Sequence, residues 1–177
     1  MRGPVFSTDD LPAAELAVDH LYRLGHRRIG MASGPVANRP ADRRVSGFVA
    51  SLARRGIADP EQWVVRQSYT VEGGQSAALS LLGRGATAVV AASDYMALGA
   101  IRGARRQGDD VPGDVSVAGY DGSMIMDFVD HPLTTVRRPA GPRGGPQRPG
   151  PAGQPRGPCG RAPRPEPGRS PRCPPTP

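Results

Sequence analysis

The chain has 177 residues, which is enough for one folded domain with a short appendage. All 23 basic residues are arginine, which excludes a Walker-type phosphate loop and a Schiff-base enzyme, because both need a lysine. Both cysteines, Cys159 and Cys173, lie in the last part of the sequence, so the rest offers no thiol nucleophile and no cysteine metal ligand. No run of about 18 apolar residues indicates a membrane span. We therefore expect a soluble, cytoplasmic protein without a metal or cofactor.

Apolar periodicity predicts alternating strands and helices along most of the chain. Short apolar runs predict strands at residues 5–7, 28–33, 63–68, 87–93 and 114–121. Between these runs, apolar side chains at helical spacing predict two helices that end near Gly25 and Gly56, and two more over 71–82 and 94–107. This alternation is typical of an α/β fold, a doubly wound parallel sheet covered by helices on both faces.

The composition changes sharply near residue 140. Residues 141–177 hold 13 of the 21 prolines and seven arginines against one acid, so they account for +6 of the net charge of +7. A segment this rich in proline, glycine and arginine cannot bury enough apolar surface to fold. We therefore expect a binding domain over residues 1–140 and a disordered tail over 141–177. The basic character belongs to the tail and does not indicate a basic binding face.

Polar and aromatic side chains follow the predicted strands at their carboxyl ends, where open α/β sheets bind ligands. Together they offer donors and acceptors for hydroxyl groups and flat rings for stacking, which a polar ring ligand needs. In chain order the residues considered at these strand ends are Asn38, Pro40, Arg44, Tyr69, Ser93, Asp94, Tyr120 and Asp121, of which all but Pro40 have a polar or aromatic side chain.

Several of these residues also have a purely structural interpretation. Arg44 lies in the first turn of a helix, where a cation opposes the helix dipole, and this favours contact with a ligand. Asp94 lies at the start of a helix, where aspartate caps exposed amides, so we interpret it as a structural cap. Both interpretations stay open for Ser93 and for Tyr69. Asp121 ends a strand with no helix clearly beginning there, which favours a ligand role.

Nothing in the sequence predicts an enzyme. The motif GRGATA at 83–88 matches a loose dinucleotide-binding pattern, but it precedes a strand instead of following one. No Gly-x-Ser-x-Gly elbow is present. His20, His26 and His131 are scattered, which favours ordinary packing or surface histidines over a catalytic base.

Five motifs resemble, in order and spacing, the effector-binding domain of the lactose-repressor (LacI/GalR) family of bacterial transcription regulators. They are AAELAVDHLYRLGHRRIGMASGP, RRVSGF, AASDYMALGAIRGARRQG, VPGDVSVAGYDGS and HPLTTVRRP. The resemblance covers about residues 5 to 140. It implies a periplasmic-binding-protein-like fold of two α/β subdomains around a sugar-sized cleft. It also implies a small effector, often a sugar or nucleobase, that shifts cleft closure and thereby the affinity for operator DNA.

The same resemblance implies roles for individual residues. Arg44 falls on the family's effector-binding arginine, Ser93 on its strand-end polar ligand, Asp121 on its hydroxyl-binding carboxylate and Tyr69 on its stacking aromatic. Two further residues fall on variable specificity positions, Asn38 and Pro40. The proline has no polar side chain, so one family contact is absent at that position.

The sequence also departs from the family pattern. A helix-turn-helix, a hinge helix and most of an N-terminal subdomain have no counterpart in these 177 residues. We therefore expect a truncated effector-binding part, which reaches operator DNA only through a missing N-terminal domain; full-length family members are homodimers. Lysine-free, arginine-rich usage is typical of GC-rich coding DNA, so we hypothesise that a frameshift near codon 140 produced the tail. A helical sequence in another downstream frame would support this, and the present frame in independent transcripts would contradict it.

Three other classes were weighed. The first is a solute-binding component of a sugar transporter, which an upstream export signal in place of a helix-turn-helix would indicate. The second is an inactive fragment. The third, an α/β enzyme, ranks last because no nucleophile–base pair or metal cluster supports it.

Overall fold

A computed structural model describes residues 10–123 and 133–137. Its centre is a five-stranded sheet with the order β2-β1-β3-β4-β5, in which every neighbouring pair is parallel. The strands are β1 (Ile29–Ser33), β2 (Val64–Arg66), β3 (Ala88–Ala91), β4 (Ser116–Asp121) and β5 (Thr134–Arg137).

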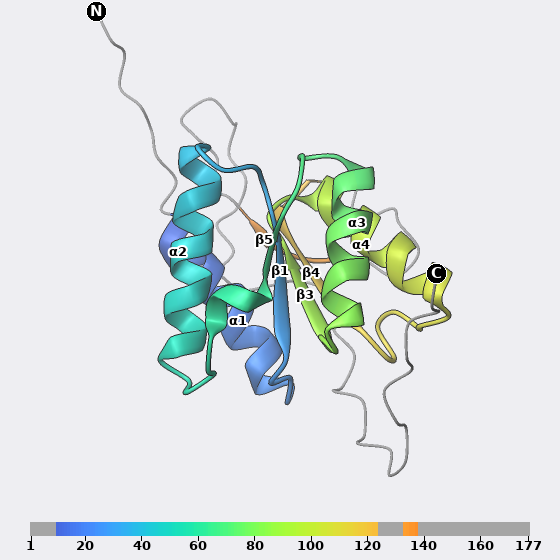
Figure 1. Cartoon of the computed structure of the whole chain (residues 1–177), viewed down its shortest axis with the longest axis horizontal. Coiled ribbons are helices and arrows are strands. Elements are labelled where there is room, and N and C mark those ends of the chain that lie inside the picture. The colour runs from blue at the N-terminus through green and yellow to red at the C-terminus, as the bar shows by residue number, and fades with distance from the viewer. Residues whose placement is uncertain (1–9, 124–132, 138–177) are drawn as a thin grey trace, which may run out of the picture.

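Helices cover both faces of this sheet (Figure 1). They are α1 (Asp10–Arg23), α2 (Arg39–Ala53), α3 (Val71–Gly83) and α4 (Asp94–Gln107), with a short 3-10 helix, η1 (Pro60–Trp63), before β2. In Figure 1, α1 and α2 lie on one face of the sheet, while α3 and α4 lie on the other. The predicted doubly wound α/β fold is therefore confirmed.

Side-chain caps set the starts of three helices. A side-chain oxygen of Asn38, Thr70 or Ser93 accepts a hydrogen bond from a backbone N–H in the first turn of α2, α3 or α4, respectively. Such caps satisfy amides that have no partner within the helix. Gly108 ends α4 with φ 90°, a left-handed conformation that glycine adopts without steric cost.

The core is built from the apolar stripes of the helices and from the central strands. Every residue of β1 and of β3 is buried, as expected for strands covered on both faces. The largest fully buried side chains include Phe48 and Leu52 of α2, Leu21 of α1 and Leu81 of α3. The edge strand β2 is only half-buried.

The amino edge of the sheet is held by a buried histidine. His26, in the turn between α1 and β1, hydrogen-bonds through Nδ1 to Thr87 Oγ1 (3.0 Å) and through Nε2 to Ser116 Oγ (2.9 Å). It therefore joins the turn before β1 to the starts of β3 and β4. Burial lowers the pKa of His26 below its ordinary value of 6.5, and the nearby His20 adds a smaller lowering.

Two features differ from the sequence prediction. β5 was not predicted, because a four-residue strand with two threonines carries little apolar signal. The predicted strand over 63–68 is shorter, since residues 60–63 form the 3-10 helix. The predicted strand at 5–7 and the predicted tail over 141–177 lie outside the described residues.

Candidate functional site

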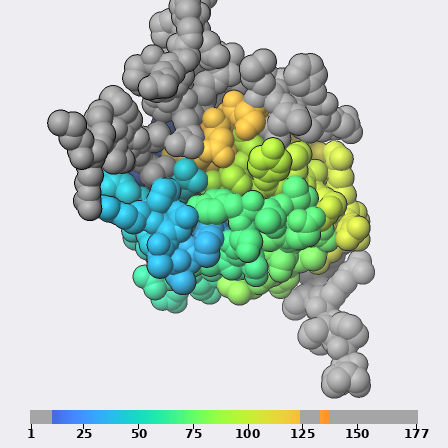
Figure 2. Space-filling model, turned by 90° about the horizontal axis from the view of Figure 1, so that it is seen from above, coloured from blue at the N-terminus to red at the C-terminus, as the bar shows by residue number. Residues whose placement is uncertain are grey.

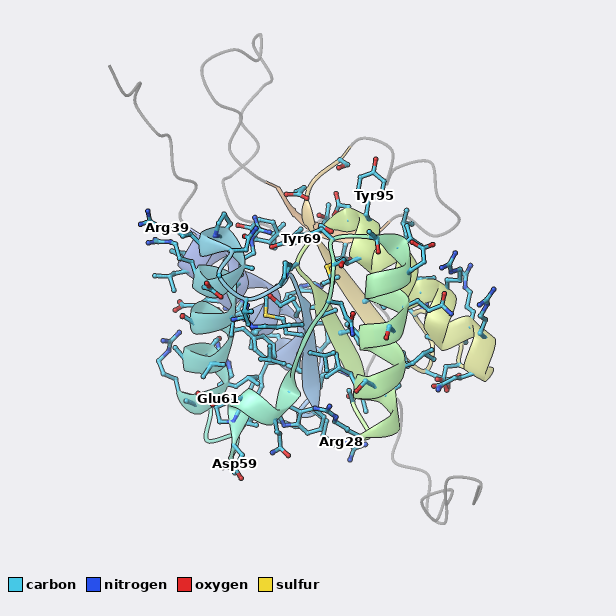
Figure 3. The ribbon with its side chains drawn as sticks, turned by 45° about the horizontal axis from the view of Figure 1, so that its top comes forward. Arg28, Arg39, Asp59, Glu61, Tyr69 and Tyr95 are labelled. Atoms are coloured by element: carbon cyan, nitrogen blue, oxygen red, sulfur yellow. The ribbon has the colours of Figure 1, made fainter. Side chains whose placement is uncertain are left out.

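The carboxyl ends of the strands meet at one edge of the sheet, because all the described strands are parallel. Figure 3 shows Tyr69 and Tyr95 at this edge, at the end of the molecule opposite Asp59, Glu61 and Arg28. In Figure 2, which views this end from above, the loop after β1 and the start of α3 lie side by side on the surface. The predicted site residues come from the segments that leave this edge.

Arg44 is buried at the carboxyl edge, with a relative exposure of only 5%. It extends from the first turns of α2, and its Nη1 donates a hydrogen bond of 2.6 Å to the carbonyl oxygen of Ala92. Its guanidinium carbon lies 3.8 Å from the centre of the Tyr120 ring. Such stacking stabilises a cation by about 0.5–2 kcal/mol. The guanidinium is thus anchored between the ends of β3 and β4.

The two contacts of Arg44 are with residues that are next in the chain to two other predicted site residues. Ala92 directly precedes Ser93, and Tyr120 directly precedes Asp121. Arg44 therefore contacts the immediate neighbours of both candidate ligand residues. The cluster of a cation, a hydroxyl and a carboxylate stays a prediction; the two contacts place the Arg44 guanidinium at the ends of β3 and β4, the strands that Ser93 and Asp121 follow or end.

The interpretation of Asp94 as a helix cap is wrong. The cap of α4 is Ser93, whose hydroxyl accepts a hydrogen bond of 3.2 Å from the Met96 amide. Asp94 is the first helical residue, and it is completely buried. Its carboxylate turns toward the end of β4 and toward β5, where it accepts hydrogen bonds from Ser123 N and Thr135 Oγ1. Asp94 remains structural, but it joins strands instead of closing a helix end.

Asp121 ends β4 and is half-buried. Its φ is 118°, which a residue with a side chain adopts only when its surroundings hold it there. Such strained backbone clusters at binding and active sites and costs about 1–3 kcal/mol. The strained backbone of Asp121 is therefore consistent with a functional position.

Tyr69 directly follows the segment that leaves β2, and its ring packs over the backbone of Gly34 at the end of β1. A Cβ at Gly34 would overlap the ring, so glycine is required for this contact. The ring is half-buried and therefore combines packing with an exposed portion.

The two predicted specificity positions have different surroundings. Asn38 caps α2, with its Oδ1 accepting a hydrogen bond of 3.1 Å from the Ala41 amide, which explains the residue without a ligand. Pro40 is exposed in the first turn of α2 and contributes no polar group.

Two contributions were not predicted from the sequence. Tyr120 was noted after β4, but its stacking on Arg44 depends on a helix about 75 residues earlier in the chain. Ser33 ends β1 with a completely buried hydroxyl that has no hydrogen-bond partner among the described residues. Buried hydroxyls are normally paired, so this one stands out at the same edge.

The described part of the chain holds no cluster of three or more His, Cys, Asp or Glu side chains that could bind a metal ion. Within the same residues, no helix has both the length and the apolar character needed to cross a membrane.

Comparison with known proteins identifies the family. Residues 18–143 match the family of periplasmic binding protein-like domains. The chain is 51% identical over 144 residues to the HTH-type transcriptional regulator reg1 of Streptomyces lividans, a match that covers 78% of this chain and 42% of reg1. It is 42% identical over 138 residues to the HTH-type transcriptional repressor CytR of Escherichia coli, which covers 77% of this chain and 40% of CytR.

A solved structure agrees with these relatives. The complex of the transcriptional regulator CelR with cellobiose superposes with a TM-score of 0.69 and 35% sequence identity, covering 73% of this chain and 40% of that chain. The fold and its edge of polar side chains define a periplasmic binding protein-like domain. The chain belongs to the family of periplasmic binding protein-like domains, and the relatives that it matches are LacI/GalR-type transcriptional regulators. It spans about two fifths of the length of the curated relatives it matches.

Proposed function

We propose that the carboxyl edge of the sheet binds a small effector of the sugar class, and that this chain is the effector-binding part of a LacI-type regulator. The observation that carries the proposal is the buried guanidinium of Arg44, which is held by the Ala92 carbonyl and the Tyr120 ring, the residues directly before Ser93 and Asp121 in the chain. A fixed cation, a hydroxyl and a carboxylate suit a ligand rich in hydroxyl groups.

In this proposal the residues divide the work. Arg44 donates hydrogen bonds to ring hydroxyls, and Asp121 accepts hydrogen bonds from them. The Tyr69 ring stacks on an apolar face of the sugar. The Ser93 hydroxyl oxygen accepts the hydrogen bond that caps α4, so its proton can be donated to a ligand. No chemical step is required, and we propose binding without turnover.

The same proposal extends to partners that lie outside this chain. In this proposal a cytoplasmic homodimer binds operator DNA through a helix-turn-helix of the kind for which the relatives are named, and the effector changes the affinity for that DNA. A transporter component remains the second candidate, because the matched domain family is periplasmic binding protein-like. The relatives that match are transcriptional regulators, which favours the first candidate.

Backbone amide NMR of the 177-residue chain tests the site directly. Cellobiose, maltose, galactose and cytidine are titrated separately at millimolar concentrations, since half a cleft binds weakly. We expect one sugar to shift the resonances of residues at the carboxyl edge, such as Ser93 and Gly122.

Variants show whether the predicted side chains carry the binding. Arg44→Ala and Asp121→Ala should each raise the dissociation constant of the sugar about tenfold or more, because each removes a hydrogen bond to a charged group. Arg39→Ala is the matched control, since it removes the same charge from the start of α2 but lies exposed at the outer side of the molecule (Figure 3). No shift with any probe, or equal shifts in wild type and Arg44→Ala, would refute the proposal.

A further inference from the structure

The buried carboxylate of Asp94 is the centre of a hydrogen-bond network that the effector site does not itself explain. Asp94 Oδ2 accepts from Ser123 N at 2.7 Å, and Oδ1 accepts from Thr135 Oγ1 at 2.7 Å. Thr135 Oγ1 in turn accepts from Gly122 N at 3.2 Å. One carboxylate and one hydroxyl therefore bind the two amides that directly follow Asp121.

A carboxylate with no exposed surface is stable only when its oxygens are hydrogen-bonded. Charge-assisted bonds of this kind are about twice as strong as neutral ones. The partners of Asp94 lie 29 and 41 residues later in the chain, so the network forms only in the folded sheet. It joins the start of α4 to the end of β4 and to β5.

The packing around this carboxylate is close. A Cβ placed on Gly119 would lie 2.5 Å from Asp94 Oδ1. Glycine at this position of β4 therefore allows the carboxylate to lie against the strand. The carboxylate therefore has little freedom to move and can hold the groups that donate hydrogen bonds to it in fixed positions.

Two candidate ligand residues flank this network in the chain. Ser93 directly precedes Asp94, and Asp121 directly precedes the two amides that the network binds. Asp121 also has the strained φ of 118°, which needs support from its surroundings. The network lies where it can supply that support.

We propose that Asp94 and Thr135 are positioning residues for effector binding, which hold Ser93 and Asp121 at a fixed separation at the carboxyl edge. Neither residue needs to contact the effector. The expected effect on effector binding rests on the proposed function. The positioning of the two residues can be measured without any ligand.

Thr135→Val is the test variant, because it removes the hydroxyl and keeps the shape of the side chain. Thr134→Val is its matched control: the Thr134 hydroxyl is also buried, in the same strand, but has no hydrogen-bond partner among the described residues. Asp94→Ala is a poorer choice, since it leaves two donors without an acceptor and endangers folding.

Amide hydrogen exchange of the 177-residue chain, followed by NMR without ligand, measures the positioning. We expect the Gly122 and Ser123 amides to exchange at least tenfold faster in Thr135→Val than in wild type. Thr134→Val should leave both rates unchanged, and Thr135→Ser, which keeps a hydroxyl, should restore them. Unchanged exchange in Thr135→Val, or equal acceleration in the Thr134 control, would overturn the proposal.

Cellobiose titration of a double-mutant cycle then tests the consequence. Thr135→Val should weaken cellobiose binding about tenfold when Asp121 is present, and by less than twofold in the Asp121→Ala background. Equal weakening in both backgrounds would mean a general structural effect and would overturn positioning. If cellobiose and the other sugars do not bind to wild type, the proposed function fails, and the exchange result alone decides whether Asp94 and Thr135 hold the segment.

Discussion

Replacing Gly119 by alanine is expected to destabilise the fold, because the added methyl group would collide with two neighbouring side chains. The added methyl carbon would lie 2.5 Å from Asp94 Oδ1 and 2.8 Å from Leu133 Cδ2, both closer than ordinary contact. Overpacking of a core costs about 1–3 kcal/mol. If the carboxylate moves away, its bond to Ser123 N or Thr135 Oγ1 weakens as well, and each hydrogen bond to a charged group contributes about 1.5–3 kcal/mol. We therefore expect a loss of about 3 kcal/mol.

Urea unfolding of Gly119→Ala and of Gly83→Ala makes the comparison. A Cβ at Gly83, the last residue of α3, meets no atom within 4 Å, so alanine there should stabilise the helix by up to about 1 kcal/mol. The two variants add the same methyl group with opposite expected signs. A loss below about 1 kcal/mol in Gly119→Ala, with an unchanged dependence on urea, would refute the close packing of Asp94 against β4.

Three further outcomes are expected. Burial lowers the pKa of both His26 and His20, so below about pH 6.5 the unfolded chain binds more protons than the folded one. The urea concentration at the unfolding midpoint should therefore decrease when the pH is lowered from 7.5 to 5.5. A midpoint that does not change with pH would argue against neutral histidines at these two positions. Asn38→Ala should cost about 1 kcal/mol in thermal unfolding through loss of the α2 cap, whereas Asn38→Asp should retain most of the stability; equal losses would show that capping is not the residue's main contribution. Gly34→Ala should displace the Tyr69 ring, lowering stability by about 1–3 kcal/mol and changing the near-ultraviolet circular dichroism; an unaltered spectrum would contradict the packing of that ring.

The alternation of strands and helices could be predicted because buried parallel strands and amphipathic helices leave different apolar periods in the sequence. Helix ends were predictable where a glycine marked them, as at Gly25 and Gly56, which follow α1 and α2 with positive φ. β5 could not be predicted in this way, because its side chains form no clear apolar pattern and the strand is held by its pairing with β4.

The site was predictable as a location but not in its contacts. Strand ends in a parallel sheet must share one edge, so the residues that follow them could be named. Asp94 was wrongly predicted to be the cap of α4, because Ser93 and Asp94 are both good caps and the choice between them depends on Thr135, 41 residues after Asp94. The contact of Arg44 with the Tyr120 ring could not be predicted either, because the two residues lie far apart in the sequence.

β4 presents successive residues to helices on opposite faces of the sheet. Gly119 lies against Asp94 of α4, and Tyr120 lies against Arg44 of α2. A slip of one residue would turn the ring toward the carboxylate and the glycine toward the guanidinium, so both contacts would be lost together. Contacts on both faces of the sheet therefore fix the alignment of β4, and single-residue insertions or deletions should be tolerated far less in β4 than in the exposed loop at residues 35–37.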